Sequence, residues 1–309
     1  MGKRATQPVI SAQGQTALTT YEQHLCTVED LSPKTIRNYL SDLRQFIAWC
    51  EVSWAEASEQ ERRFTPTTIT TPLVTRYRAY LQTDAHLQPA SINRALISIK
   101  RYCAWCLDHD QLKRDPAKVV KLVRAMPKAP RHLSDDDEDA LVAAVSNGGN
   151  LRDRTIILLM LHTGLRAGEV CRLRRQDVRL GKRSGALSVI GKRNKHRDIP
   201  LNATARAALE DYLPSLASDG AVLFPSEKTG QALQERALGY LVAKYAAQAR
   251  IAAVRPHDLR HRFGYRMAEK VPLHRLAQIM GHDSLDTTMR YSQGTPRDLQ
   301  REVEKIAWC

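Results

Sequence analysis

The sequence lacks the features that mark secreted, membrane-spanning and nucleotide-hydrolysing proteins. Its six cysteines are scattered and form no disulfide framework, and the one close pair, Cys103 and Cys106, fits two core positions on a helix better than a zinc site. No apolar run is long enough for a membrane span or a signal peptide, and no glycine-rich phosphate-binding motif is present. We therefore expect a cytoplasmic protein with no membrane partner and no cofactor.

Aromatic residues are also scarce, whereas positive charge is abundant. Aromatics make up 6% of the chain, and no aromatic strand motif of the RNA-binding kind occurs. The formal net charge is +14, and both halves of the chain contribute to it. Because nucleic-acid binders neutralise phosphates with lysine and arginine, this balance favours a DNA partner.

The stretch 11–126 has the pattern of a helical domain and follows a flexible N-terminus at 1–10. Ser32-Pro33, Thr71-Pro72 and Pro89 are helix start signals, and apolar residues recur at helical spacing behind each of them. We expect this domain to be helical throughout.

Some of these helices carry basic and polar residues away from their apolar stripe. A solvated surface explains one such face, whereas several in one small domain make DNA contact an equally good interpretation. The candidate DNA-binding residues of this domain are Lys34, Arg37, Arg44, Asn93, Arg94, Lys100 and Arg101, and Lys195 in the second half of the chain is a further candidate.

Prolines and basic residues at 127–133 predict a linker, and a second domain follows at 134–294. Its first residues are Ser134 and a run of four acidic residues. A serine N-cap with carboxylates in the first helical turn explains this run better than a metal site. The clearest strand pattern comes later, where apolar residues at 187–190 and 199–201 flank a turn. We expect a hairpin whose turn carries Lys192 and Lys195.

Five short segments of the second half stand out when they are considered together. Each has an ordinary explanation by itself, as a surface arginine, a solvated lysine or a core tyrosine. Their conjunction in this order and spacing requires another explanation. The residues are Arg166 and Glu169 in the run TGLRAGE, Lys192 in the turn, His257 and Arg260 in the run HDLRH, His282 after Gly281, and Tyr291 nine residues later.

These segments resemble the tyrosine recombinase, or phage integrase, family and within it the XerC/XerD-like members. The resemblance covers essentially the whole chain and implies a mostly α fold with a small β-sheet. It implies an N-terminal helical core-binding (SAM-like) domain and a C-terminal α+β catalytic domain of the DNA breaking-rejoining type. Arg262, Gly264, Met280 and Gln293 depart from the family's commoner residues, which are a small hydroxyl residue, Ala, Leu and His respectively.

The residue types suit phosphodiester chemistry independently of the resemblance. Arg166 and Arg260 can hold the phosphate oxygens, and such donors typically contribute on the order of 3–4 kcal/mol each. Tyr291 would be the nucleophile, and because a free tyrosine has a pKa near ~10 it needs a proton acceptor, for which His257 is the candidate. Lys192 could protonate the leaving oxygen, and His282 could bond the phosphate. We expect cleavage without metal or ATP.

The resemblance implies further properties of the reaction and of the assembly. It implies a 3′-phosphotyrosyl intermediate, strand exchange through a Holliday junction and a homotetramer on two duplexes, with a paralogous recombinase as a possible partner. The residues 295–309 would form a helix docking on a neighbouring protomer. A bacterial or mobile-element origin and a place at the nucleoid follow. The alternatives left open are a type IB topoisomerase-like nicking-closing enzyme and a catalytically silent DNA-binding regulator.

Overall fold

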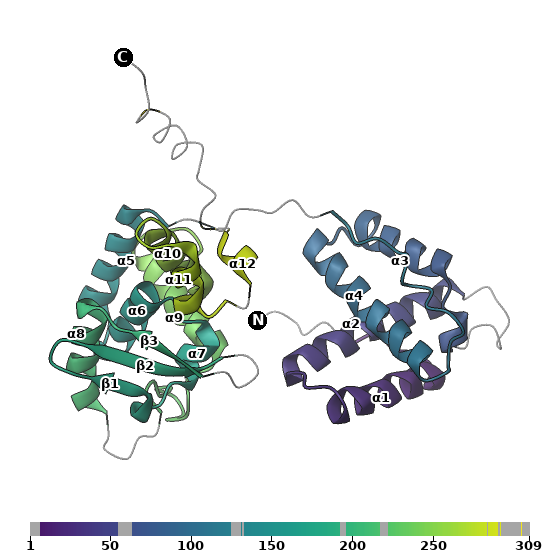
Figure 1. Cartoon of the computed structure of the whole chain (residues 1–309), viewed down its shortest axis with the longest axis horizontal. Coiled ribbons are helices and arrows are strands. Elements are labelled where there is room, and N and C mark those ends of the chain that lie inside the picture. Colours follow the sequence, from purple (N-terminus) through teal and green to yellow (C-terminus); the bar gives the residue numbers. More distant parts are fainter. Residues whose placement is uncertain are drawn as a thin grey trace. The chain divides into compact units, whose positions relative to one another are not determined.

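The computed structural model describes residues 7–54, 64–124, 131, 133–191, 196–216, 222–282, 284–289, 291 and 304. The chain divides into two units, Met1–Pro127 and Lys128–Cys309 (Figure 1). Each unit has its own apolar core. Within the described ranges, no helix combines the length and the apolar character needed to cross a bilayer. The predicted linker lies largely outside these ranges, as do residues 1–6.

In the part of the first unit that the structure describes, four α-helices turn their apolar faces into one core. They are α1 (Ala12–Thr27), α2 (Pro33–Ser53), α3 (Thr71–Thr83) and α4 (Pro89–Asp108), with a short 3-10 turn at Pro66–Thr68. The predicted starts at Pro33 and Pro89 are confirmed, and the Ser32 hydroxyl caps α2. Cys103 and Cys106 are both buried in this core, as free thiols.

The expectation of helix throughout this unit is wrong for the stretch after α4. Asp110 takes a left-handed conformation (φ 57°), and no helix follows it up to residue 124. Hydrogen bonds from side chains of α4 to the backbone of this stretch hold it against that helix. The Asn93 amide donates to Val123 O (2.9 Å) and accepts from Val123 N (2.8 Å), and Lys100 Nζ donates to Ala117 O (2.6 Å).

The described residues of the second unit form the helices α5 to α12 and one small sheet (Figure 1). The helices are α5 (Asp135–Gly148), α6 (Leu151–Thr163), α7 (Ala167–Arg172), α8 (Ala203–Tyr212), α9 (Glu235–Gln248), α10 (Pro256–Ala268), α11 (Leu273–Met280) and α12 (Leu285–Met289). Short 3-10 turns lie at Arg175–Asp177 and Leu213–Ser215. The mostly α fold with a small sheet is confirmed.

The sheet is antiparallel, in the order β1 (Val178–Leu180), β2 (Gly185–Ile190), β3 (His196–Pro200). Strands β2 and β3 form the predicted hairpin, with Leu187 opposite Ile199. The turn between them, with Lys192 and Lys195, lies outside the described residues. Strand β1 has no clear sequence signal because it is only three residues long.

Helix α5 begins as predicted. The Ser134 hydroxyl accepts from Asp137 N (3.0 Å), and the Asp137 carboxylate accepts from Ser134 N (3.2 Å). This reciprocal pair satisfies two backbone donors at the helix start, and the neighbouring carboxylates face the positive end of the helix dipole. Capping therefore accounts for Ser134 and Asp137 in this run.

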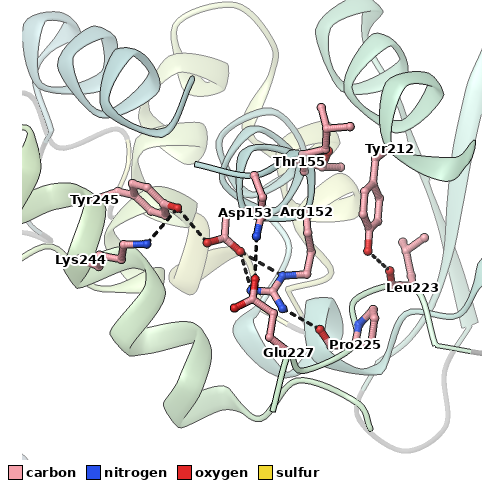
Figure 2. Close-up of polar contacts among 11 residues, drawn as sticks. Arg152, Asp153, Thr155, Tyr212, Leu223, Pro225, Glu227, Lys244 and Tyr245 are labelled. Atoms are coloured by element: carbon pink, nitrogen blue, oxygen red, sulfur yellow. Dashed lines mark hydrogen bonds and ion pairs between the residues drawn. The ribbon is translucent and has the colours of Figure 1, made fainter. Parts of the chain in front are cut away.

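Helix α6 is fastened at its start by a polar network that Figure 2 shows. Arg152 binds the Asp153 carboxylate through Nε (3.0 Å) and Nη2 (2.7 Å), and Nη1 donates to Pro225 O (2.8 Å). The Tyr245 hydroxyl of α9 donates to the other Asp153 oxygen (2.9 Å). Since Asp153 is buried, these donors offset the cost of desolvating its charge. The network holds the N-terminal end of α6 in place. The candidate site lies at the C-terminal end of the same helix.

Candidate active site

Arg166 lies at a turn between two helices, as predicted. Helix α6 ends at Gly164, which takes a left-handed conformation (φ 64°), and a Cβ there would lie 2.4 Å from the Phe263 ring. Only glycine meets both conditions without strain. The turn makes Arg166 the N-cap residue of α7, with its side chain about one third exposed (37%).

Glu169 orients Arg166 from within the protein. The Glu169 carboxylate accepts from Arg166 N (2.8 Å) and from Arg166 Nη1 (2.9 Å), and the Arg166 Nη2 donates to Gly281 O (2.7 Å). Glu169 is buried, and burial by itself raises the pKa of its carboxyl. Hydrogen bonds from Arg197 and from the Arg166 backbone outweigh burial, so the pKa lies below its usual value and the group is ionised.

Arg197 of β3 is a site residue that the sequence analysis missed. Its Nη1 and Nη2 donate to the two Glu169 oxygens (2.9 and 3.0 Å), a bidentate pair. A Cβ on Gly281 would lie 2.7 Å from Arg197 Cζ, so the guanidinium lies directly against that glycine. Strand alternation could have indicated that Arg197 points into the protein, because Arg197 lies on the same face of β3 as the buried residue Ile199.

Arg260 lies on α10 between the ends of two other helices. It is 2% exposed, and its guanidinium donates to Gly164 O at the end of α6 and to Met280 O at the end of α11 (2.8 Å for the latter). Helix C-termini carry partial negative charge and stabilise a cation there. Burial, and then the charge of Arg166, lower the pKa of Arg260 to about 10, so it remains cationic at neutral pH.

The histidines of the site lie around Tyr291. His257 is exposed in the first turn of α10, and its ring centroid is 4.2 Å from that of His261. The Tyr291 hydroxyl shares a hydrogen bond with His261 Nδ1 (2.9 Å), and Tyr291 is 6% exposed. His282 Nδ1 pairs with Thr288 Oγ1 (2.8 Å), and the His282 ring is stacked 6.3 Å from the Tyr291 ring.

The structure therefore brings Arg166, Glu169, Arg260, His282 and Tyr291 into one region of the second unit. His261 forms a hydrogen bond with the Tyr291 hydroxyl, and this contact was not predicted from the sequence. His261 follows Arg260 in the run HDLRH and is one helical turn from His257, and this spacing was the available signal.

Several of the basic residues predicted to contact DNA make contacts within the first unit. Arg94 pairs with the buried Asp42 through Nε (3.0 Å) and Nη2 (2.8 Å), and Arg101 pairs with Glu29. Arg44 Nη2 donates to Gln15 (2.6 Å), and Asn93 and Lys100 hold the stretch after α4, as described above. Lys34 and Arg37 are exposed on the first turns of α2.

Both units match known protein-family models. Residues 131–297 match the phage integrase family, and residues 18–109 match the phage integrase N-terminal SAM-like domain. Among curated relatives, the tyrosine recombinase XerC of Pelobacter propionicus is 31% identical over 278 residues, which is 88% of each chain. The tyrosine recombinase XerD of Xanthomonas axonopodis pv. citri is 34% identical over 239 residues, which is 71% of this chain and 77% of that one.

Solved structures share the fold at low sequence identity. The XerH recombinase in a post-cleavage complex with difH DNA has a TM-score of 0.72 at 18% identity, covering 97% of this chain and 89% of that one. The Tn1549 integrase in complex with transposon right end DNA has a TM-score of 0.71 at 16% identity, and the match covers 94% of this chain and 99% of that one. With both family models matched and a relative aligned along most of its length, the chain belongs to the phage integrase family of tyrosine recombinases.

Proposed function

We propose that this chain is a site-specific recombinase that cleaves and rejoins duplex DNA through Tyr291. One observation carries the proposal: Arg166 and Arg260 both donate to carbonyl oxygens at the end of α11, and Arg260 shares helix α10 with His261, which binds the Tyr291 hydroxyl. Two guanidiniums that keep their charge at neutral pH suit a phosphate that gains negative charge during displacement. Solved relatives of the same fold bound to DNA support the DNA partner.

In the proposed reaction, Tyr291 Oη attacks the phosphorus and the bond to the 5′ oxygen breaks. The phenol proton passes to a histidine, His257 or His261, and the 5′ oxygen takes a proton from Lys192. The product is a 3′-phosphotyrosyl enzyme and a free 5′ hydroxyl. Attack by the 5′ hydroxyl of another strand reverses the step, so rejoining needs neither ATP nor a metal ion.

The proposed assembly is a tetramer on two duplexes that exchanges one strand pair at a time through a Holliday junction. The existence of relatives named XerC and XerD supports pairing with a second, paralogous recombinase. The docking of residues 295–309 on a neighbouring protomer belongs to the same proposal, and that segment lies outside the described residues apart from Glu304.

A nicked suicide substrate, in which the cut strand end diffuses away, tests the chemistry. The wild-type protein should form a covalent DNA adduct in excess EDTA and without ATP, and Tyr291→Phe should form none. A wild-type protein without any adduct would contradict the proposal. Recombination between two marked sites distinguishes a recombinase from a topoisomerase-like enzyme, which would only relax supercoils.

A further inference from the structure

We propose that Thr288 is a positioning residue whose hydroxyl donates to His282 Nδ1 and so keeps the imidazole proton on Nε2. This inference rests on the proposed function, because His282 is the residue expected to bind the phosphate. The contact that carries it joins Thr288 Oγ1 to His282 Nδ1 at 2.8 Å. A neutral imidazole has one N–H, so the partner of Nδ1 decides which of the two nitrogens holds it.

The Thr288 hydroxyl has a different partner from the hydroxyls of other threonines in the helices of this chain. Helical threonines often donate to the carbonyl oxygen four residues earlier. The threonines that do so here are Thr16, Thr19, Thr20, Thr27, Thr75, Thr83, Thr155 and Thr163. Thr288 lies in α12, and in the part of the chain that the structure describes its hydroxyl bonds to His282 alone.

Burial decides which of the two atoms donates. Thr288 is 0% exposed, so water does not reach its hydroxyl. If the hydroxyl accepted a proton from Nδ1, its own proton would be buried without an acceptor, which is costly. If the hydroxyl donates, both groups are satisfied and Nδ1 carries no proton. The imidazole proton then lies on Nε2, at the other edge of the ring.

Thr288 also joins His282 to the two other groups of the proposed reaction. Gly281 O accepts from Arg166 Nη2 (2.7 Å), so His282 directly follows a carbonyl that binds an arginine of the site. Thr288 O accepts from Tyr291 N (3.0 Å). The His282 and Tyr291 rings are nearly parallel (12°), with centroids 6.3 Å apart. Thr288 therefore contacts His282 with its side chain and the proposed nucleophile with its backbone.

The inferred tautomer suits the expected role of His282. A non-bridging phosphate oxygen gains negative charge during displacement and is stabilised by an N–H that already points at it. Nε2–H is such a donor without any change in the charge of the ring. A histidine whose other nitrogen is held by a neighbouring side chain keeps both its tautomer and its orientation, as in metal sites where a carboxylate orients the ring.

Nitrogen NMR of the DNA-free protein labelled with 15N-histidine measures the tautomer directly. Long-range proton–nitrogen spectra at about pH 8, where histidine is neutral, separate protonated from unprotonated ring nitrogens. The His282 signals are identified by their loss in His282→Gln. In the wild type, Nδ1 should be unprotonated and Nε2 protonated. In Thr288→Val, which keeps the shape and removes the hydroxyl, both signals should move toward the average of two exchanging tautomers.

Single-turnover adduct formation at saturating suicide substrate measures the consequence for the reaction. Thr288→Val should form adduct about tenfold more slowly, because His282 loses its fixed geometry. Its dissociation constant for DNA should stay within about threefold of the wild-type value, since no phosphate contact of a cationic side chain is removed. Thr288→Ser keeps the hydroxyl and should restore the wild-type rate and nitrogen spectrum.

Thr287→Val is the matched control, because Thr287 is the neighbouring residue of the same helix and is half-buried. Its hydroxyl has no hydrogen-bond partner among the described residues, so the variant should keep the wild-type rate and spectrum. A slow Thr288→Ser would show that packing rather than the hydroxyl matters, and would overturn the proposal. An unchanged rate in Thr288→Val would do the same.

A protonated Nδ1 of His282 in the wild type would overturn the proposal without any variant, and this measurement decides if Thr288→Val does not fold, judged by its thermal melt. A wild-type protein that forms no adduct would contradict the proposed function alone, because the nitrogen spectrum does not depend on cleavage.

Discussion

At the residue scale, the site depends on a chain of charges that reaches from the sheet to Arg166. Arg197 holds Glu169 bidentately, and Glu169 in turn holds both the backbone and the side chain of Arg166. Arg197 is therefore a positioning residue, since it acts on Arg166 through the carboxylate between them.

Arg197→Met should lower the rate of covalent adduct formation by about 10- to 100-fold, because Arg166 loses its fixed geometry. The dissociation constant for the DNA site should change by less than about threefold, since one guanidinium contributes little of the total phosphate contact. Arg179→Met is the matched control on the same sheet, because its pair with Asp198 is exposed (59% and 56%). Equal losses of binding and cleavage would contradict a positioning role.

Glu169 should make the stability of the protein depend on acid pH. Its pKa is lowered in the folded chain, so its stabilising contribution is complete above the unfolded value of about 4.3 and is lost as the pH falls through the folded value. Urea unfolding between pH 6 and pH 3, compared for the wild type and Glu169→Gln, measures this contribution. The gap in unfolding free energy should narrow as the pH falls below about 4. A gap that is constant with pH would contradict the ionised state of Glu169.

At the element scale, the helix starts were predictable and the stretch after α4 was not. Ser32, Ser134 and the prolines at 33 and 89 act through neighbours in the sequence, so local pattern is enough to predict the helices that they begin. The stretch 109–124 is held by Asn93 and Lys100 from within α4, and such contacts have no local signature. The same holds for Arg197 and His261, whose roles depend on what packs against them.

Arg262, a departure from the family pattern, joins α10 to the start of α5. Its guanidinium is buried and binds Glu138 through Nε (2.6 Å), Leu133 O through Nη1 (3.0 Å), and the Asp135 carboxylate. Arg266 also binds Glu138 (2.9 Å). Helix α5 follows the linker directly, so this cluster fixes the first element of the second unit.

Arg262→Met should destabilise the second unit by roughly 3 kcal/mol, because the buried Glu138 loses one of its two arginine partners. Urea unfolding measures the loss, and Arg236→Met on the exposed face of α9 is the control. The double variant Arg262→Met with Glu138→Leu should recover most of the stability, since it leaves no buried charge unpaired. A loss below about 1 kcal/mol in the single variant would show that the cluster is only a surface network.

At the scale of the whole molecule, the positive charge is divided between residues that form ion pairs within the fold and residues that are exposed on its surface. Composition predicted the nucleic-acid partner but not this division, because Arg94 and Arg101 find acidic partners distant in sequence. Lys34 and Arg37 are exposed at the start of α2, and their contact with phosphate stays a prediction.

Lys34→Gln and Arg37→Gln should each weaken DNA binding and reduce the slope of log binding constant against log salt by about 0.9. Binding titrations at several salt concentrations measure that slope. Asn93→Ala is the comparison within the same unit. It should leave the slope unchanged and lower the free energy of unfolding by about 2 kcal/mol, because the partly buried backbone of Val123 loses both of its hydrogen bonds to Asn93. An unchanged slope in both Lys34→Gln and Arg37→Gln would show that the start of α2 does not contact DNA phosphates.

Mapping the covalent adduct to a single residue tests the central claim most directly. After cleavage of a suicide substrate labelled on either side of the scissile phosphate, the protein is digested and the DNA-linked peptide is sequenced by mass spectrometry. The predicted result is a nucleotide attached through its 3′ phosphate to Tyr291, at a yield lowered at least about 100-fold in Arg166→Ala and in Arg260→Ala. Attachment at another residue, or through a 5′ phosphate, would contradict the account.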